Sequence, residues 1–202
     1  MDNPLKINSV TKPGESLFKD KGSKHLGFIF PVTNENEAKQ KLEEIKNLHP
    51  KANHHCFSYV IANGNQPIER YSDDGEPSGS AGLSIFNQLK KAELQNALAI
   101  VVRYFGGTKL GVGGLINAYR TATELAIENA TIISKIPTTQ LKISVSFDNI
   151  SNVNQIINQN RIAIINEEYT NNYAIFVEVE YHLVTWLNSL FENIPDIIIE
   201  EF

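Results

Sequence analysis

ALAIVVRYF at residues 97–105 decides the fold, and the glycine-rich segment GGTKLGVGGL at residues 106–115 follows it directly. The first six residues of this stretch are all apolar, without the alternation of a strand that has one exposed face. Such a run predicts a central strand that is buried on both faces of its sheet. The glycine-rich segment then leads into a helical pattern at residues 115–130. We therefore predict a strand–loop–helix unit at the centre of the N-terminal part of the chain.

The sequence before and after this strand alternates between strand and helix patterns. Asn34 can cap a helix that ends near Pro50, and acidic residues fill the first turn of that helix. Gly64 and Asn65 form a turn signal, which predicts a hairpin between the strands on either side. We expect a sheet of mixed pairing. Its strands are expected at residues 25–32, 55–63, 66–72 and 97–105, and its helices at residues 34–50, 81–93 and 115–130.

A second pattern of elements begins after Pro137. Residues 141–202 show the order strand–helix–strand–strand–helix–strand, which is typical of the ferredoxin-like arrangement. We therefore predict an α+β protein of two domains, which span residues 1–136 and 137–202. Trp186 has apolar neighbours on the last helix of this pattern and is expected in the core.

Composition and charge limit the classes of protein to which the chain can belong. Cys56 is the only cysteine, so no intramolecular disulfide can form and a reducing cytoplasm is expected. Neither a run of about 18 apolar residues nor a signal-peptide pattern is found. The net charge of −5 is uneven, because residues 1–140 carry +2 and residues 141–202 carry −7. A polyanionic partner is therefore expected on the N-terminal part, and no specificity for DNA is evident.

The loop YSDDGEPSGSAG at residues 71–82 gathers three carboxylates, those of Asp73, Asp74 and Glu76. Carboxylates at this spacing could hold a hard cation or share a proton in acid–base catalysis. They could equally form a turn before a helix, with Ser78 or Ser80 as its cap. The residues alone leave a structural turn, a binding site and a catalytic site open, and no metal can be named.

The glycine-rich segment leaves many backbone N–H groups uncovered by side chains, beside Lys109 and the strand residue Arg103. Such a loop can cradle an anion at the start of the following helix. Neither the phosphate-binding Walker motif nor the dinucleotide-binding fingerprint fits its spacing. Close backbone packing around tight turns remains an equal alternative. The candidate residues here are Gly106, Gly107, Gly111, Gly113 and Gly114.

The tripeptide of His54, His55 and Cys56 suggests a metal site or a nucleophile. Zinc needs further ligands at suitable spacing, which the sequence does not supply. On a strand, adjacent side chains point to opposite faces, so His55 cannot readily activate Cys56. Cys56 is better explained as a small buried apolar residue, and the pair is kept only as a secondary site.

Three motifs together resemble the Impact family, in its bacterial YigZ-like branch. The resemblance extends over residues 15–130, with mild departures at Ser80, Val102 and Val112. It implies an N-terminal domain like the second domain of ribosomal small-subunit protein five, and a C-terminal domain like the ferredoxin-like last domain of elongation factor G. The motifs are ANHHCFSY at 52–59, SDDGEPSGSAG at 72–82 and VVRYFGGTKLGVGGLINAYR at 101–120.

The resemblance implies a regulator of translation that is not an enzyme and needs no cofactor, because eukaryotic relatives regulate translation. Its expected partners are RNA, the ribosome or a translation-associated protein. A metal-dependent hydrolase or phosphate-handling enzyme that uses residues 73–76 and a protein-docking module are the alternatives. The expected binding residues are Asp73, Asp74, Glu76, Arg103, Tyr104, Gly106, Gly107, Lys109, Gly113 and Gly114, with His55 and Cys56 as secondary candidates.

The acidic and glycine-rich loops are expected close together, since each lies between a strand and the helix that follows it. The carboxylates of Asp73, Asp74 and Glu76 would then face Arg103 and Lys109, and opposite charges that close attract each other. Two arrangements are possible. The charges either line a cleft that meets a partner, or they form an internal ion network that closes the two loops.

Overall fold

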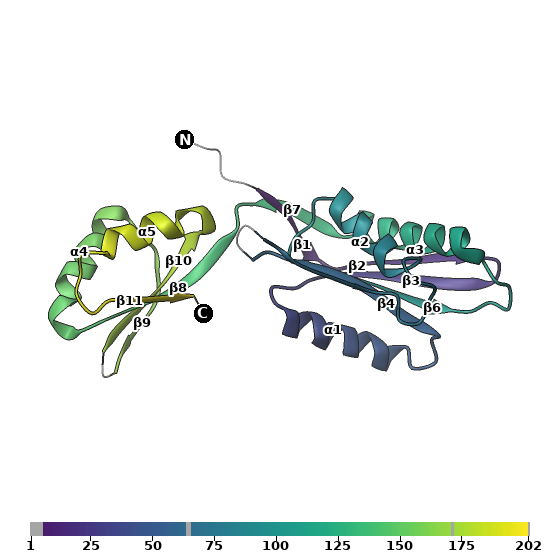
Figure 1. Cartoon of the computed structure of the whole chain (residues 1–202), viewed down its shortest axis with the longest axis horizontal. Helices are drawn as coiled ribbons and strands as arrows, with labels where there is room; N and C mark the ends of the chain where they lie inside the picture. The colour runs from purple at the N-terminus through teal and green to yellow at the C-terminus, as the bar shows by residue number, and fades with distance from the viewer. Residues whose placement is uncertain (1–5, 64–65, 171, 202) are drawn as a thin grey trace. The chain divides into compact units, whose positions relative to one another are not determined.

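The computed structural model describes residues 6–63, 66–170 and 172–201. The chain divides into two compact units, one of Ile7–Lys135 and one that begins at Ile136. Each unit is a sheet with helices packed on it (Figure 1), so the expected α+β class is confirmed. Within the described residues, no helix is long and apolar enough to cross a bilayer.

The first unit is built on a five-stranded sheet in the order β2-β3-β6-β4-β5. β6 is central, as its apolar run predicts, and seven of its eight residues are buried. Every pairing between neighbouring strands of this sheet is antiparallel, so the expectation of mixed pairing is wrong. The strands are β2 Gly14–Asp20, β3 Ser23–Pro31, β4 His54–Ile61, β5 Ile68–Ser72 and β6 Ala97–Tyr104.

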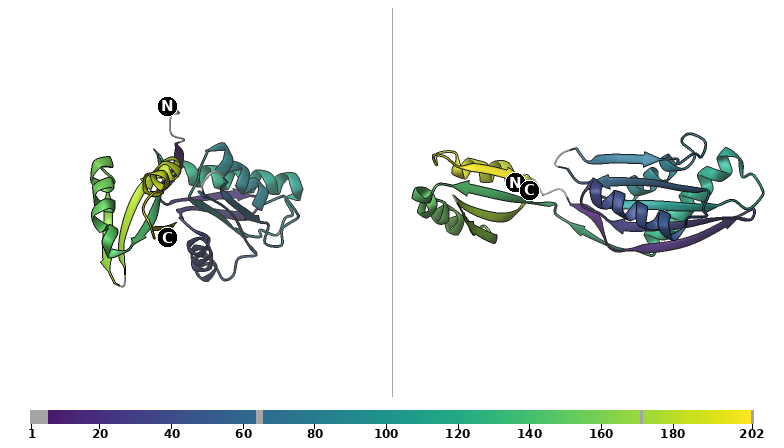
Figure 2. Two further views of the ribbon diagram at one scale, coloured as in Figure 1. Left: turned by 60° about the vertical axis from the view of Figure 1, so that its left-hand side comes forward. Right: turned by 90° about the horizontal axis from the view of Figure 1, so that it is seen from below.

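Helices cover both faces of this sheet (Figures 1 and 2). α1 (Glu35–Leu48) lies on one face, and its predicted cap is confirmed, since the Asn34 side chain accepts a hydrogen bond from the Glu37 N–H at 2.9 Å. α2 (Gly82–Lys91) and α3 (Gly111–Glu128) lie on the other face. β6 is therefore enclosed from both sides, which explains why its sequence is apolar without alternation.

α3 packs unusually close to the sheet because small residues face each other at the contact. The side chain of Ser16 on β2 donates a hydrogen bond to the Ala122 carbonyl at 2.6 Å. A Cβ atom on Gly27 of β3 would lie only 2.4 Å from that same carbonyl oxygen. Glycine is therefore required at residue 27 by the approach of the helix backbone.

The sequence patterns missed three strands and placed the start of α3 too late. β2 was missed because its residues alternate between exposed and half-buried, with charges among them. The other two are β1 (Ile7–Lys12) and β7 (Thr131–Lys135), which form a two-stranded sheet with each other. α3 begins at Gly111, so three of the loop glycines belong to its first turn.

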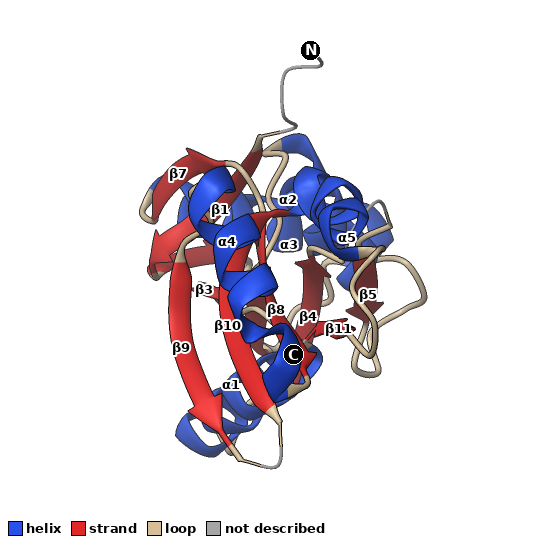
Figure 3. Cartoon of the chain, turned by 90° about the vertical axis from the view of Figure 1, so that its left-hand side faces the viewer, coloured by secondary structure: helices blue, strands red, loops and turns tan. Residues whose placement is uncertain are grey.

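The second unit has the strand order β11-β8-β10-β9, with α4 and α5 packed on one face of the sheet (Figure 3). This order and the chain sequence of elements confirm the ferredoxin-like βαββαβ arrangement. The expectation for Trp186 is wrong: it is 41% exposed, and Leu187 and Phe191 form the buried side of α5 instead. The elements are β8 Thr138–Val145, α4 Ile150–Asn160, β9 Ile164–Tyr169, β10 Tyr173–Glu180, α5 Val184–Phe191 and β11 Ile198–Glu201, with short 3-10 turns at Phe147–Asn149 and Tyr181–Leu183.

The contact between α3 and the sheet can be tested by adding a methyl group at residue 27. Gly27→Ala is expected to lower the free energy of unfolding by about 1–3 kcal/mol, because the added Cβ overpacks a filled contact. Urea unfolding followed by far-UV circular dichroism measures the change. Gly113→Ala is the control, since the same methyl there meets no atom within 4 Å and replaces glycine inside a helix. Equal unfolding midpoints for Gly27→Ala and the wild type would contradict the close approach.

Candidate functional site

Three polar residues lie in register across the middle of the five-stranded sheet. Arg103 near the end of β6 pairs with His25 on β3 and with His54 at the start of β4. Residues directly opposite each other on antiparallel strands share a face of the sheet, so all three side chains lie on the α2 and α3 side. β5 and β6 both run opposite to β4, and the loops that follow them therefore leave the sheet at the same end.

Glu76 from the acidic loop lies at the centre of this cluster. Its carboxylate accepts hydrogen bonds from Arg103 Nη1 at 2.5 Å and from the Tyr119 hydroxyl at 2.7 Å. His54 Nε2 lies 3.8 Å from the same oxygen. The side chains of Glu76 and Arg103 are only 4% and 7% exposed, so this is a buried ion pair. It joins the acidic loop, the central strand and α3.

Asp73 holds the first turn of α2. One of its carboxylate oxygens accepts hydrogen bonds from the N–H groups of Ala81 and Gly82, and the other accepts one from Gly79. The expectation that Ser78 or Ser80 caps this helix is therefore wrong, and Asp73 satisfies the free N–H groups instead. The carboxylate of Asp73 is engaged by the backbone of its own loop.

Asp74 ties the acidic loop to the start of β4. Its carboxylate accepts a hydrogen bond from the His55 N–H at 2.6 Å, and its carbonyl oxygen lies 2.7 Å from His54 Nδ1. Because a carbonyl only accepts, Nδ1 of His54 carries the proton. Asp74 and Gly75 have φ angles of 43° and 85°, so the chain turns here through two left-handed residues.

Cys56 lies beneath the acidic loop and is fully buried. Its thiol donates a hydrogen bond to the Asp73 carbonyl at 3.0 Å and lies 3.4 Å from the Tyr119 hydroxyl. Burial raises the pKa of the Cys56 thiol and that of the Tyr119 phenol. The thiol therefore stays protonated at neutral pH, which disfavours a nucleophilic role.

His25 is fully buried between Phe18, Tyr119 and Arg103. Neither of its ring nitrogens has a hydrogen-bond partner among the described residues. Burial, followed by the positive charge of Arg103, lowers the pKa of His25 to about 4. The ring is therefore neutral near pH 7 and lies against a permanently charged guanidinium.

The glycine-rich segment remains on the surface at this end of the sheet. Lys109 is exposed and forms no ion pair with any described residue. A Cβ atom would meet nothing within 4 Å at Gly107 or Gly113. Gly106 differs, since its Cβ would lie 1.9 Å from the backbone of Gly22. Gly106 is thus required by packing, whereas residues 107–109 face solvent and Leu110 is buried.

The remaining predicted residues lie elsewhere. The Tyr104 hydroxyl bonds to His49 Nδ1 at 3.0 Å on the α1 side of the sheet, and His55, in register with Val102, also lies on that side. Burial lowers the pKa of His55. The roles of His25, His54 and Tyr119 were not predicted from the sequence. For His54 and Tyr119 the signal was available, since both lie within the motifs that carry the family resemblance.

The cluster's chemistry is that of a structural network. The carboxylates of Asp73, Asp74 and Glu76 all accept hydrogen bonds from protein donors. Within residues 6–63, 66–170 and 172–201, no group of three His, Cys, Asp or Glu side chains is arranged to hold a metal ion. The ion pair between Glu76 and Arg103 therefore corresponds to an internal ion network rather than to a cleft lined by free charges. Lys109 lies outside this network.

Comparison with known proteins supports the resemblance. A family model described as the Impact N-terminal domain matches residues 21–127. The IMPACT family member YvyE of Bacillus subtilis (strain 168) is 38% identical over 127 residues, which are 63% of this chain and 58% of that protein. The IMPACT family member YigZ of Escherichia coli (strain K12) is 34% identical over 133 residues, which are 65% of each chain. The chain thus spans less than two thirds of both relatives.

Solved structures also resemble the chain. A crystal structure described as that of a hypothetical protein has a TM-score of 0.71 and 26% sequence identity. The match covers 98% of this chain and 97% of the chain in that structure. The match to the structure of the two-domain translational regulator Yih1 covers 64% of this chain and 50% of the Yih1 chain, with a TM-score of 0.37 and 22% identity. At that TM-score the second likeness supports no argument about function.

The buried ion pair can be tested by removing one charge without changing shape. Glu76→Gln is expected to lower the free energy of unfolding by about 3–5 kcal/mol, because Arg103 would remain buried without its counter-charge. Urea unfolding measures the effect. Glu124→Gln is the control, since it removes the same charge from the surface pair with Lys91 and should change stability by less than about 1 kcal/mol. Similar effects of both substitutions would contradict the assignment.

The neutral state of His25 predicts a pH dependence of stability. Between pH 6.5 and 4 the unfolded chain binds a proton at His25 that the folded chain does not, so stability falls as the pH falls. The free energy of unfolding should fall by about 3 kcal/mol near pH 4 because of His25. Urea unfolding at several pH values measures it, with His25→Phe as a ring that cannot titrate. Parallel curves for wild type and His25→Phe would contradict the prediction.

Proposed function

Because the chain belongs to the Impact family, we propose that it is a non-enzymatic regulator of translation that binds RNA, the ribosome or a ribosome-associated protein. The observation that carries the proposal is the division of charge at the end of the central strands. The carboxylates there are engaged inside the unit, whereas Lys109 is exposed and forms no ion pair with the part of the chain that the structure describes. The face left for a partner is thus basic and rich in backbone N–H groups.

The start of α3 is suited to a phosphate group. Its first turn contains no acidic residue, and no side chain caps it. Glycines at residues 111, 113 and 114 leave the N–H groups of this turn uncovered, and Lys109 lies two residues before the helix. Free N–H groups and the helix dipole both favour an anion at such a position. We assign the contact with the RNA backbone to residues 107–114.

The charge of the two units supports the same assignment. Residues 141–202 carry a net charge of −7, which repels phosphate, whereas residues 1–140 carry +2. In the proposed mechanism the first unit meets RNA through Lys109 and the start of α3, and the network around Glu76 holds that surface in place. A structure that is fixed before binding loses less conformational entropy when it binds.

The hydrolase alternative has weaker support. It requires carboxylates that are free to hold a metal or move a proton, and those of the acidic loop are already hydrogen-bonded within the protein. Docking of a protein is favoured by one specific observation, which is the exposure of Phe105, Val112 and Ile116 around Lys109. It is therefore the second candidate, and salt dependence separates it from RNA binding.

The test is cosedimentation of the purified protein with ribosomes and with ribosome-free RNA over a series of salt concentrations. Gly113→Glu should abolish binding, because it places a carboxylate in the first turn of α3 while adding a side chain only to open space. Gly113→Gln is the matched control, with the same length and no charge. Lys109→Gln should weaken binding and reduce the slope of log affinity against log salt by about one.

The outcomes distinguish the two candidates. Binding that falls steeply with salt and is lost in Gly113→Glu supports contact with RNA. Binding to ribosomes alone, with little salt dependence, supports a docked protein. Equal binding by Gly113→Glu and Gly113→Gln would overturn the assignment to residues 107–114, provided that both variants unfold at the same urea concentration as the wild type.

A further inference from the structure

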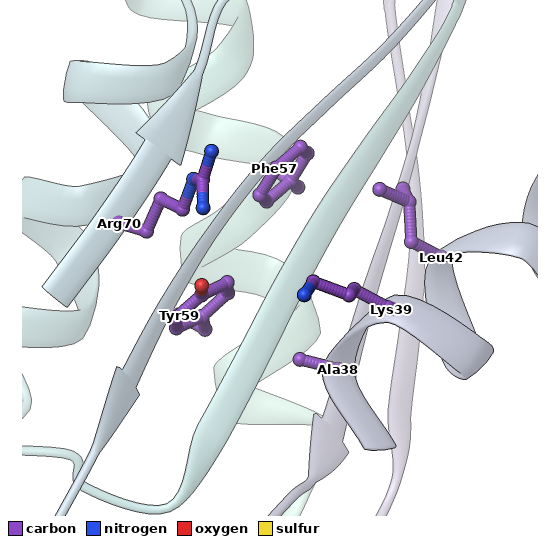
Figure 4. Close-up of a pocket in the computed structure, with 6 residues that line it drawn as sticks. All are labelled: Ala38, Lys39, Leu42, Phe57, Tyr59 and Arg70. Carbon is purple, nitrogen blue, oxygen red and sulfur yellow. The ribbon is translucent and has the colours of Figure 1, made fainter. Parts of the chain in front are cut away.

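A pocket opens on the face of the five-stranded sheet that α1 covers, away from the buried ion pair. Its floor consists of Phe57 and Tyr59, two residues apart on β4, so that both side chains point to the same face. The two rings are nearly parallel, with 13° between their planes and 6.2 Å between their centroids. Phe57 is partly exposed at the bottom of the pocket (Figure 4), whereas Tyr59 is only 2% exposed and packs beside it.

Two cationic side chains lie on opposite sides of this floor (Figure 4). Arg70 comes from the edge strand β5, where it is directly opposite Tyr59 in the antiparallel register. Lys39 comes from α1, whose Ala38 and Leu42 complete the wall. Both cations are exposed, and neither forms an ion pair with a described carboxylate.

The carboxylates nearest to the pocket on α1 are already engaged. Glu35 accepts a hydrogen bond from the Tyr59 hydroxyl. Glu43, one turn after Lys39, pairs with Lys46 at 2.8 Å. Burial raises the pKa of Tyr59, so its hydroxyl remains the donor in the bond to Glu35. Lys39 and Arg70 are thus two exposed cations that pair with no described carboxylate, and the Glu35 carboxylate is held by the neutral Tyr59 hydroxyl beside them.

The dimensions of the pocket limit what it can hold. Its volume is about 150 Å³. Pockets that enclose drug-sized ligands have roughly 300–1,000 Å³, so this one suits a single ring system rather than a whole cofactor. Flat aromatic side chains stack on nucleobases of any sequence, and Arg and Lys bind phosphate.

We propose that this pocket is a nucleotide-binding site. The base stacks on Phe57, and the phosphate lies between Lys39 and Arg70. A free nucleotide and one nucleotide of a single-stranded RNA present the same chemistry here. The site shares no residue with the start of α3, so it can fail or succeed independently of the contact surface proposed above.

The test uses adenosine 5′-monophosphate, ribose 5-phosphate and a ten-nucleotide single-stranded RNA as probes. Calorimetry on the full chain measures affinity, and amide NMR shifts locate the bound probe. The monophosphate should shift amides of β4, β5 and α1, and ribose 5-phosphate should bind at least tenfold more weakly because it lacks the base. Binding by the RNA that shifts the amides of β4, β5 and α1, without binding by the free monophosphate, would support the site with RNA as the source of the nucleotide.

Three variants test the roles of the lining residues. Phe57→Leu keeps an apolar side chain but removes the ring, and it should weaken binding about tenfold. Lys39→Gln and Arg70→Gln should each weaken binding severalfold and reduce the salt slope by about one. Lys51→Gln is the control, because it removes the same charge from an exposed residue outside the pocket.

Three results would overturn the proposal. One is that neither the monophosphate nor the RNA shifts the amides of β4, β5 and α1. Another is equal binding of ribose 5-phosphate and the monophosphate, which would show that the base is not recognised. The third is binding that is unchanged in Phe57→Leu, Lys39→Gln and Arg70→Gln. Urea unfolding confirms that each variant is folded, and if Phe57→Leu is destabilised the two glutamine variants decide the outcome.

Discussion

The ion pair between Glu76 and Arg103 is the interaction on which the first unit depends. A buried charge is stable only when it is paired and hydrogen-bonded, and here one carboxylate meets the guanidinium, the Tyr119 hydroxyl and, at a longer distance, His54. The pair links a loop, the central strand and α3. The position of the acidic loop is therefore set by electrostatics. The ion pair also fixes the end of the central strand, from which residues 107–114 follow.

Two faces of the same sheet thus have different characters. On the α2 and α3 side, the carboxylates of the acidic loop and the guanidinium of Arg103 are bound within the protein. On the α1 side, the cations of Lys39 and Arg70 stand open above an aromatic floor. A buried charge must be paired within the protein, whereas an exposed charge that is left unpaired is available to a partner. By this criterion the acidic motif and Arg103 belong to the framework, and we propose the exposed Lys39, Arg70 and Lys109 for recognition.

The sequence predicted the central strand and both helix-covered layers because apolar periodicity records burial. It also predicted that a carboxylate of the acidic loop would meet Arg103, and Glu76 does. It could not predict which carboxylate would meet Arg103, since spacing does not distinguish Asp73 from Glu76. β1 and β7 were missed because neither has a clear apolar face, and each is defined by a partner about 120 residues away. Such pairings depend on the tertiary structure.

The pairing of β1 with β7 has a topological consequence. Ile7 lies opposite Lys135, so the start of the first strand and the end of the last strand of the unit lie side by side. A module whose ends meet can be inserted between other segments of chain, or joined to a second domain, without distortion of its core. Its ends could also be linked directly and new ones opened in a surface turn, with the same sheet retained. The pairing of β1 with β7 therefore allows this unit to be combined with other domains as an independent module.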